Sequence, residues 1–339
     1  MHYSVGAFFL LIKRFSMGAD LAQLKEMDDE MLAAQVKPEL EALENIRHEK
    51  LHALRRRQKL AIPISCVCAP ITGFVDFMLL IGEWGGGDGG FGVSILFFGL
   101  LWYWVSEPKR QYAKSYKKKI LPQIAKTLGN LHYIEKGKLI VDTLKASKIV
   151  PSYNRHDCED YFFGEYKGTK IELSEVELKY RSKSGDDETI TTVFDGLVFL
   201  IDVPKQIFGH TVLRPNQHGF FEWFNEKSLG LERADLVSLE FEDIYDVYTN
   251  DQVEARYLVH PKIIENFTAL SKEYEGGRLL AEYYNGRLLL MLPSKAKHFE
   301  PASIHVEATN IKTLIELKRE LVSVLSIIDE LELATKQLS

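Results

Sequence analysis

The hydrophobic positions of this chain begin with a helical period. Between Asp20 and Lys59, leucines and other apolar residues recur roughly every three to five positions, with Glu and Lys filling many of the positions between them. This spacing predicts an amphipathic helix that leads into the segment that follows. Pro38 lies inside the helix and is expected to break or kink it, because proline lacks a backbone N–H and its ring clashes with the preceding turn.

Two apolar segments follow, Leu60–Gly82 and Phe91–Val105, joined by the glycine-rich turn Glu83–Gly90. The first segment has 23 residues, and about 20 apolar residues suffice to cross a bilayer. The second is shorter, needs some of the preceding glycines to span, and ends in the aromatic cluster Trp102–Trp104, which is typical of a membrane interface. The two segments predict a transmembrane hairpin. The alternative, two buried core helices of a soluble protein, is disfavoured because soluble cores seldom contain such long uncharged stretches.

Basic residues surround both ends of the predicted hairpin and are absent from its turn. The flanks carry ten Lys and Arg residues between them, and Glu83–Gly90 carries none. The positive-inside rule therefore places both ends of the hairpin, and both termini, in the cytoplasm. Basic residues beside a membrane also attract anionic headgroups, at about 1 kcal/mol per charge. We predict such lipid contacts for Arg55, Arg56, Arg57, Lys117, Lys118 and Lys119.

Asp76 is the one charged residue of the first apolar segment. An ionisable group at membrane depth is a functional hypothesis by default. A hydrated position near the outer interface is the favoured alternative, because the segments contain no second charge with which to relay a proton or bind an ion. Cys66 and Cys68 would point to different faces of a helix, so we interpret them as small packing residues and not as metal ligands.

Beyond the hairpin, helical structure is expected from Glu107 to about Lys148, and after Pro151 the pattern changes to a period of two, which is typical of strands. The predicted strands are Tyr161–Tyr166, Thr169–Tyr180, Thr189–Val203 and Thr211–Leu213, with turns at Lys167–Gly168 and Ser182–Glu188. Pro261 is expected to open a helix that ends near Gly276, and Asn285–Gly286 predicts a β-hairpin turn. The last helix, Thr309–Leu333, has a wide apolar face that favours packing on a sheet; self-association through it stays open.

These elements predict an α+β protein with an N-terminal helix, a two-helix transmembrane hairpin and a cytoplasmic, antiparallel β-rich domain that ends in a long helix. The predicted divisions are an amphipathic helical segment at residues 1–59, the hairpin at 60–106, a basic juxtamembrane helix at 107–150 and the cytoplasmic α+β domain at 151–339.

The sequence offers little catalytic chemistry. It lacks the phosphate loop, the nucleophile elbow, HExxH and CxxC, and its net charge of -6 argues against nucleic-acid binding. The polar run Tyr153–Asp160 is interpreted as a solvated turn, and His210 and His218 as surface histidines. The acidic residues Glu240, Glu242, Asp243, Asp246 and Asp251 do not match a calcium loop. We predict no metal, no cofactor, no disulfide framework and no catalytic residue.

Three stretches, DYFFGEYKGTKIELSEVEL, FDGLVFLIDVPKQIFGHTVLRP and DVYTNDQVEARYLVHPKIIENF, resemble the DUF3137 family of uncharacterised bacterial membrane proteins. Val36–Arg47 is similar to the LxPxLxxLExxR-like segment of that family, and the order of helix, hairpin and soluble domain is similar too. The most specific match is Asn250–His260, with His260 where the family more often has Thr. The resemblance implies a bacterial inner membrane location and a LemA-like membrane protein as partner, and it implies no catalytic residue.

Two classes of function follow. The first is a membrane-anchored interaction or scaffold module, whose cytoplasmic domain binds protein or lipid; its interaction candidates are Asp251, Glu254, Arg256 and Tyr257. The second is a membrane-tethered enzyme with an acidic site that draws on Asp157, Asp160, Asp251, Glu254 and Arg256. A small transporter is a weaker third class, because two helices without a polar lining form no path unless several copies assemble.

Overall fold

The structure is a computed structural model. It describes residues 29–81, 92–137, 144, 147–184, 187–203, 207–215, 230–234, 245–273, 279–294 and 296–336. The predicted helix start at Asp20, the turn Glu83–Gly90, His218 and the helix stop at Gly276 lie outside these residues. The chain divides into two compact units: the helical unit, Glu30–Ile120 with Glu300–Ile315, and the sheet unit, which contains Leu121–Phe299 and Glu316–Ser339.

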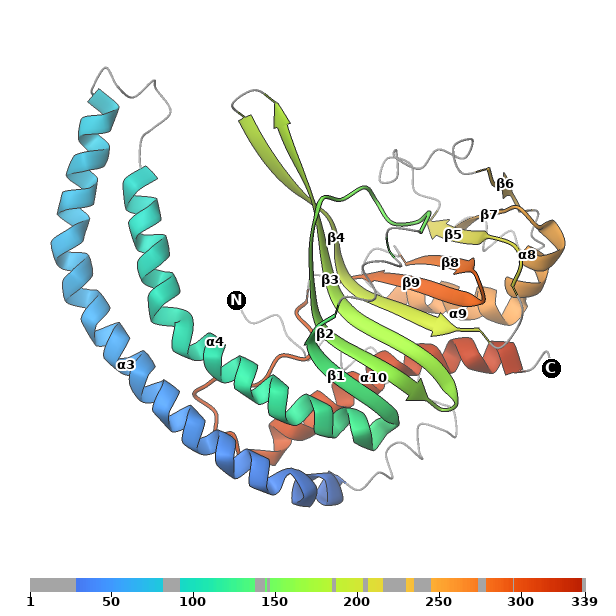
Figure 1. Ribbon diagram of the computed structural model, residues 1–339, viewed down its shortest axis with the longest axis horizontal. Helices are drawn as coiled ribbons and strands as arrows, with labels where there is room; N and C mark the ends of the chain where they lie inside the picture. Colours follow the sequence, from blue (N-terminus) through green and yellow to red (C-terminus); the bar gives the residue numbers. More distant parts are fainter. Residues whose placement is uncertain are drawn as a thin grey trace. The chain divides into compact units, whose positions relative to one another are not determined.

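The helical unit is built on two long helices, α3 (Asp29–Ile81) and α4 (Gly92–Leu128), of which α4 continues into the sheet unit. They run side by side in the helical unit (Figure 1), and hydrogen bonds join them at Arg57–Trp104 and at Asp76–Val93. Of the break or kink predicted at Pro38, the break does not occur, since α3 is one helix through that residue. Pro38 is exposed, and the buried Val36 and Leu40 on either side offset the cost of the lost hydrogen bond.

The segment Glu300–Asn310 is held against α3 within the helical unit by the two charged residues of the LxPxLxxLExxR-like segment. Glu44 accepts a hydrogen bond from the Ala308 N–H (2.7 Å), and Arg47 donates one to the Ile304 carbonyl (3.1 Å). Glu44 and Arg47 also form an ion pair at 2.5 Å, and the hydrogen bond from Arg47 lowers the pKa of Glu44 below its usual value. Glu44 and Arg47 therefore have a structural role in this chain.

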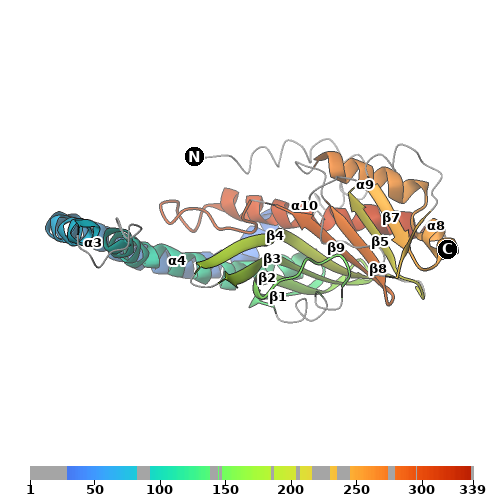
Figure 2. The same cartoon turned by 90° about the horizontal axis from the view of Figure 1, so that it is seen from above.

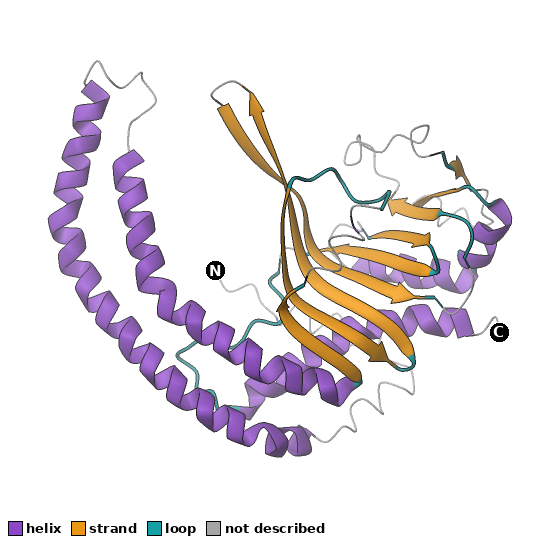
Figure 3. Ribbon diagram, in the orientation of Figure 1, coloured by secondary structure: helices purple, strands orange, loops and turns teal. Residues whose placement is uncertain are grey.

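The sheet unit contains an antiparallel sheet of nine described strands in the order β1-β2-β3-β4-β9-β8-β5-β7-β6 (Figure 3). The strands are β1 (Asn130–Lys136), β2 (Arg155–Tyr166), β3 (Thr169–Ser184), β4 (Asp187–Asp202), β5 (Thr211–Pro215), β6 (Glu232–Arg233), β7 (Tyr245–Thr249), β8 (Leu280–Tyr284) and β9 (Arg287–Pro293). The described helices are α8 (Gln252–Leu258), α9 (Pro261–Glu273) and α10 (Ile311–Lys336). The chain is thus α+β, with long N-terminal helices, a large antiparallel sheet and a C-terminal helix.

Both predicted two-residue turns are confirmed. Lys167 and Gly168 join β2 to β3 with φ values of 48° and 84°, and Asn285 and Gly286 join β8 to β9 with φ values of 51° and 71°. Positive φ at both positions is the type I′ geometry that matches the twist of a hairpin. Pro261 opens α9, as predicted.

Two expectations for this region are wrong. The helix expected from Glu107 to about Lys148 ends at Leu128, because Asn130–Lys136 forms β1, which pairs with β2 and buries Leu131. The solvated turn expected at Tyr153–Asp160 is largely strand, since β2 begins at Arg155. Its polar side chains are mostly exposed, and the ladder from Arg155↔Lys179 to Glu159↔Glu175 sets its conformation.

The sheet has a packed core on each face. On one face α9 and α10 lie on the same side of the strands (Figure 2), and Phe267 of α9 meets Tyr245 of β7 with ring centroids 6.1 Å apart. The predicted apolar face of α10 is buried at Leu314, Leu317, Leu321, Val324 and Ile328. On the other face a cluster that includes Val198, Leu289 and Met291 packs with residues of the segment before β2.

Candidate functional site

The helical unit presents a surface whose polarity is inverted relative to that of a soluble protein. Within Leu60–Ile81 of α3 the buried side chains are Thr72 and Asp76. The large apolar side chains are exposed: Leu60, Ile62, Ile64, Val67, Ile71, Phe74, Val75, Phe77, Met78, Leu79, Leu80 and Ile81. On α4 the exposed apolar residues are Ile95, Leu96, Phe98, Leu100, Trp102, Tyr103 and Trp104. We call this the hairpin surface. Exposed apolar area of this extent marks an interaction with lipid or protein.

Asp76 lies between the two helices and caps α4. Its carboxylate accepts hydrogen bonds from the backbone N–H groups of Val93 (2.9 Å) and Ser94 (3.0 Å), in the first turn of α4. The first N–H groups of a helix have no partner within the helix, and a carboxylate there is also favoured by the helix dipole. Asp76 is 1% exposed, so its interaction is with protein groups and not with solvent. Sequence reasoning singled out Asp76 and missed this role, because Val93 lies 17 positions away.

A second contact between the helices lies at the other end of the hairpin surface. Arg57 donates a hydrogen bond to the Trp104 carbonyl (2.6 Å) and pairs with Glu107, and its guanidinium lies 5.1 Å from the Trp104 ring centroid. Arg110 lies 3.9 Å from the ring centroid of Tyr103. The cations and the aromatic cluster predicted for an interface therefore contact one another directly.

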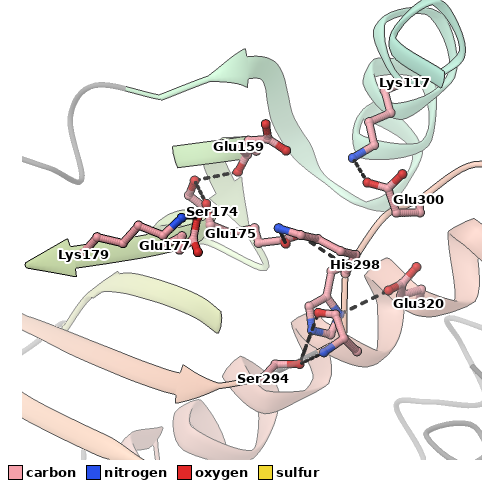
Figure 4. Close-up of polar contacts among 12 residues, drawn as sticks. Lys117, Glu159, Ser174, Glu175, Glu177, Lys179, Ser294, His298, Glu300 and Glu320 are labelled. Carbon is pink, nitrogen blue, oxygen red and sulfur yellow. Dashed lines mark hydrogen bonds and ion pairs between the residues drawn. The ribbon is translucent and has the colours of Figure 1, made fainter. Parts of the chain in front are cut away.

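The predicted headgroup-binding residues divide into two groups. Arg55, Arg56 and Lys118 are exposed, and Lys119 is partly buried. Arg57 is committed to α4, as described above. Lys117 is 7% exposed and its ammonium lies 2.6 Å from Glu300 (Figure 4). Arg55, Arg56 and Lys118 are thus accessible on the surface, whereas Lys117 has a structural ion pair.

The interaction candidates Asp251 and Glu254 satisfy backbone groups near α8. Asp251 is the N-cap of α8 and accepts from the N–H groups of Val253 and Glu254 at 3.0 Å each. Glu254 accepts from the N–H groups of Phe208 and Gly209 at 2.9 Å each. Both carboxylates therefore hold local structure in place. Arg256 and Tyr257 are exposed on α8.

The residues of the hypothetical acidic site are not brought together. Asp157 and Asp160 lie in β2, and Asp251 follows β7; five strands separate β2 from β7 in the sheet. At about 4.8 Å per strand spacing, the two groups are roughly 29 Å apart. Asp160 is buried and accepts a hydrogen bond from the Tyr133 hydroxyl at 2.7 Å. Among the described residues, no three His, Cys, Asp or Glu side chains form a group suited to a metal ion.

His210 is not a surface residue, contrary to the prediction. It is buried, pairs with Glu282 of β8 and stacks on Tyr284, with ring centroids 4.5 Å apart. Glu282 also accepts hydrogen bonds from the Ser147 hydroxyl and the Lys148 N–H (3.0 Å to the latter). His210 and Glu282 lie 72 positions apart, and no local sequence pattern indicates that they pair. We call these residues the Glu282 cluster.

A second buried polar group, centred on His298, has the residue types of a catalytic triad (Figure 4). His298 Nε2 lies 2.9 Å from Ser294 Oγ, and His298 Nδ1 lies 3.2 Å from Glu320 Oε1. The backbone N–H groups nearby are already used: that of Ser294 by the Asp195 carbonyl, that of Ala296 by Ser294 Oγ, and that of His298 by Glu175. A serine nucleophile needs free donors for an oxyanion, and these three are not free. The group therefore ties the 294–299 segment to α10 and β3.

The charges beside His298 are mutually compensating. Burial tends to lower the pKa of Lys297, but its hydrogen bond to Glu175 (2.8 Å) and the surrounding carboxylates raise that pKa above its usual value. Burial raises the pKa of Asp195.

Elsewhere in the sheet unit, burial raises the pKa of the Cys158 thiol to about 11, so this thiol is not a nucleophile near neutral pH.

Comparison with known proteins identifies the C-terminal part of the chain. A search of curated proteins gave no match. Among solved structures, the chain is similar to the crystal structure of the mycobacterial trehalose monomycolate transport factor A, TtfA, with a TM-score of 0.32, 10% sequence identity, and coverage of 63% of this chain and 94% of that one. Residues 192–333 match a family model described as a protein of unknown function, DUF3137. This match over residues 192–333 supports membership in the DUF3137 family, as the sequence resemblance predicted.

Proposed function

We propose that this chain is an interaction module anchored in a bacterial inner membrane by the α3–α4 hairpin, with both flanks of the hairpin in the cytoplasm. The observation that carries the proposal is the hairpin surface, which is apolar outside and polar inside. Twelve large apolar side chains of Leu60–Ile81 are exposed. At about 1.5–3 kcal/mol for each such side chain removed from water, hydrocarbon around this helix is worth on the order of 20 kcal/mol.

The lengths of the helices fit this proposal. Among the described residues one helix, α3, is long and apolar enough to cross a membrane by itself. Its part from Leu60 to Ile81 extends about 33 Å at 1.5 Å per residue, against roughly 30 Å of hydrocarbon. The apolar part of α4, Gly92–Val105, extends only about 21 Å. In a hairpin, α4 therefore begins below the outer interface, where Asp76 supplies the acceptor that water cannot.

The charges near Arg57 and Trp104 support an orientation. Arg55, Arg56, Lys59, Lys109, Lys114 and Lys118 are exposed on the two helices at this end. Their attraction for anionic lipid headgroups adds to the positive-inside preference, and both keep this end of the hairpin in the cytoplasm. Because the chain continues from both helices at this end, the sheet unit lies on the cytoplasmic side in this proposal.

A cysteine-labelling experiment tests the anchor. With Cys66→Ala and Cys68→Ala as background, Gly87→Cys in the turn is expected to react with a membrane-impermeant maleimide added to intact spheroplasts. Lys118→Cys is expected to react only after the membrane is opened. Cys158 can stay, because it is buried. Labelling of both sites in intact spheroplasts, or of neither, would contradict the hairpin topology.

The interaction side of the proposal rests on the α8 surface, made of Phe208, Val253, Arg256 and Tyr257. Phe208 is 83% exposed and Val253 is 77% exposed. Glu254, the residue after Val253, accepts a hydrogen bond from the Phe208 N–H and so holds the backbone of Phe208 beside α8. Exposed aromatic and aliphatic residues beside an arginine have the composition of an interface centre.

Co-purification from native membranes tests this surface, with the LemA-like protein as the partner to be detected. The double variant Phe208→Ser, Val253→Ser is expected to lower recovery of that protein at least about tenfold, since two apolar contacts of over 1 kcal/mol each are lost. Ile134→Ser removes a comparably apolar exposed side chain from β1 and should leave recovery unchanged. Equal recovery with both variants would exclude the α8 surface as the binding site.

A further inference from the structure

The β3–β4 hairpin extends beyond the rest of the sheet as a two-stranded ribbon (Figures 1 and 3). Its ladder continues outward to Ser184↔Asp187. Along β3, pairing with β2 ends at Arg155↔Lys179. Along β4, pairing with β9 ends at Gly196↔Pro293, and one more hydrogen bond runs from the Ser294 N–H to the Asp195 carbonyl. Two-stranded ribbons are marginally stable in water unless a further strand or layer supports them.

The two edges of this ribbon differ. The β3 edge is closed by Asn154, whose side-chain amide accepts from the Arg181 N–H (2.8 Å) and donates to the Arg181 carbonyl (2.7 Å). The Asn154 N–H also donates to the Lys179 carbonyl (3.1 Å). These are the bonds that a neighbouring strand would make. Among the described residues, no strand or side chain does the same for β4 beyond Asp195.

The register shows which groups the β4 edge presents. Ile190 lies opposite Arg181, and Thr192 lies opposite Lys179. The main-chain N–H and C=O of Arg181 bond to Asn154 and so point away from β4. Arg181 and Ile190 are therefore a non-hydrogen-bonded pair, in which the main-chain groups of Ile190 also point away from β3. The N–H and C=O of Ile190, and those of Glu188 and Thr192 two positions on either side, therefore point outward from β4. The run Thr189–Thr192 is exposed and β-branched throughout, which favours strand pairing.

We propose that the β4 edge pairs with the β4 edge of a second copy of this chain, antiparallel and centred on Ile190. In that register Ile190 lies opposite its counterpart, Glu188 lies opposite Thr192 of the other copy, and Thr189 lies opposite Thr191. These pairs place no like charges opposite each other. The sequence Lys179–Thr192 has three basic and three acidic residues, so two ribbons do not repel each other through net charge. The result is a four-stranded sheet in which both ribbons have a supporting neighbour.

Disulfide trapping tests the register in the full chain, solubilised in detergent with Cys66→Ala and Cys68→Ala as background. Thr189 and Thr191 form a non-hydrogen-bonded cross-strand pair in this arrangement, about 4.5 Å apart at Cα, which suits a disulfide. A mixture of Thr189→Cys chains with Thr191→Cys chains is expected to cross-link faster than either variant alone. Equal rates in all three samples, or no cross-link, would overturn the proposed register.

The oligomeric state tests the edge itself. The unsubstituted chain in detergent is expected to show the mass of a dimer by analytical ultracentrifugation. Ile190→Pro removes an outward N–H and should weaken the dimer at least about tenfold. Arg181→Pro is the matched control. Arg181 lies opposite Ile190, but its N–H faces Asn154 and not the proposed dimer edge, so its loss should leave dimerisation unchanged. A monomeric unsubstituted chain, or a dimer equally strong in Ile190→Pro, would overturn the proposal.

Discussion

Asp76→Leu is expected to lower the stability of the α3–α4 hairpin in the proposed membrane by about 3–6 kcal/mol. The substitution leaves the N–H groups of Val93 and Ser94 without their acceptor, and in hydrocarbon each unsatisfied backbone group costs several kcal/mol. The leucine is more apolar than the aspartate, so a simple hydrophobicity argument predicts the opposite sign. The expected loss follows because the first turn of a helix within the membrane requires an acceptor from its surroundings.

Two further variants isolate this effect. Asp76→Asn keeps an amide oxygen that accepts a hydrogen bond, so about half of the loss is expected. Thr72→Val changes the other buried polar residue of the segment, whose hydroxyl bonds only to the Ala69 carbonyl of its own helix (3.2 Å), and should cost less than about 1 kcal/mol. The measurement is unfolding in mixed micelles with increasing SDS. Stability of Asp76→Leu at or above that of the unsubstituted chain would show that Asp76 is not a cap in the membrane.

The capping role also changes the interpretation of Asp76, which the sequence predicts to be a charge at membrane depth. Sequence reasoning weighed an ion or proton pathway against a hydrated position, and neither describes what the carboxylate does in the structure. Asp76 compensates for the shortness of α4, whose apolar part begins at Gly92 and ends at Val105. In the proposed membrane, a polar residue within the hydrocarbon then serves the fold of the hairpin and needs no transported substrate.

Local patterns predicted the elements of the sheet unit well. The type I′ turns at Lys167–Gly168 and Asn285–Gly286 require positive φ, which Gly168 and Gly286 adopt without strain and Asn285 tolerates. The start of α9 at Pro261 and the buried face of α10 follow from proline geometry and from apolar spacing. In each case residues close in the chain determine the conformation, so the amino-acid sequence of this chain alone is enough to predict it.

Elements determined by distant partners were not predictable in this way. Arg155–Asp160 has little apolar alternation and is a strand because β3 supplies its ladder. β1 follows a helix after one residue, Gly129, and is stabilised by pairing with β2. β4 pairs with β9, more than 80 positions later, which brings Asp195 to Ser294 and so positions the His298 group. Such contacts depend on strand order, which periodicity does not contain.

Glu282→Ala is expected to cost the sheet unit about 3–5 kcal/mol of unfolding free energy. Glu282 is 2% exposed and accepts hydrogen bonds from His210, Ser147 and the Lys148 N–H. Its removal deprives the buried His210 and the partly buried Lys148 N–H of their carboxylate acceptor, and removing one partner of a buried polar contact is costly because the other stays desolvated. For a domain whose total stability is about 5–15 kcal/mol, that loss is a large fraction.

Matched variants separate this effect from the loss of a carboxylate in general. Glu282→Gln keeps the shape and one acceptor oxygen and should cost less than Glu282→Ala. Glu165→Ala removes an exposed carboxylate from β2 and should change stability by less than about 0.5 kcal/mol. Urea unfolding of the full chain in detergent, followed by near-UV circular dichroism, gives these differences. If Glu282→Ala were as stable as Glu165→Ala, the Glu282 cluster would not hold Ser147 and Lys148 on the sheet. The stability lost in Glu282→Ala is also expected to include packing of the segment before β2. Leu144 and Ile149 lie on either side of Ser147 and Lys148 and belong to the apolar cluster on that face of the sheet.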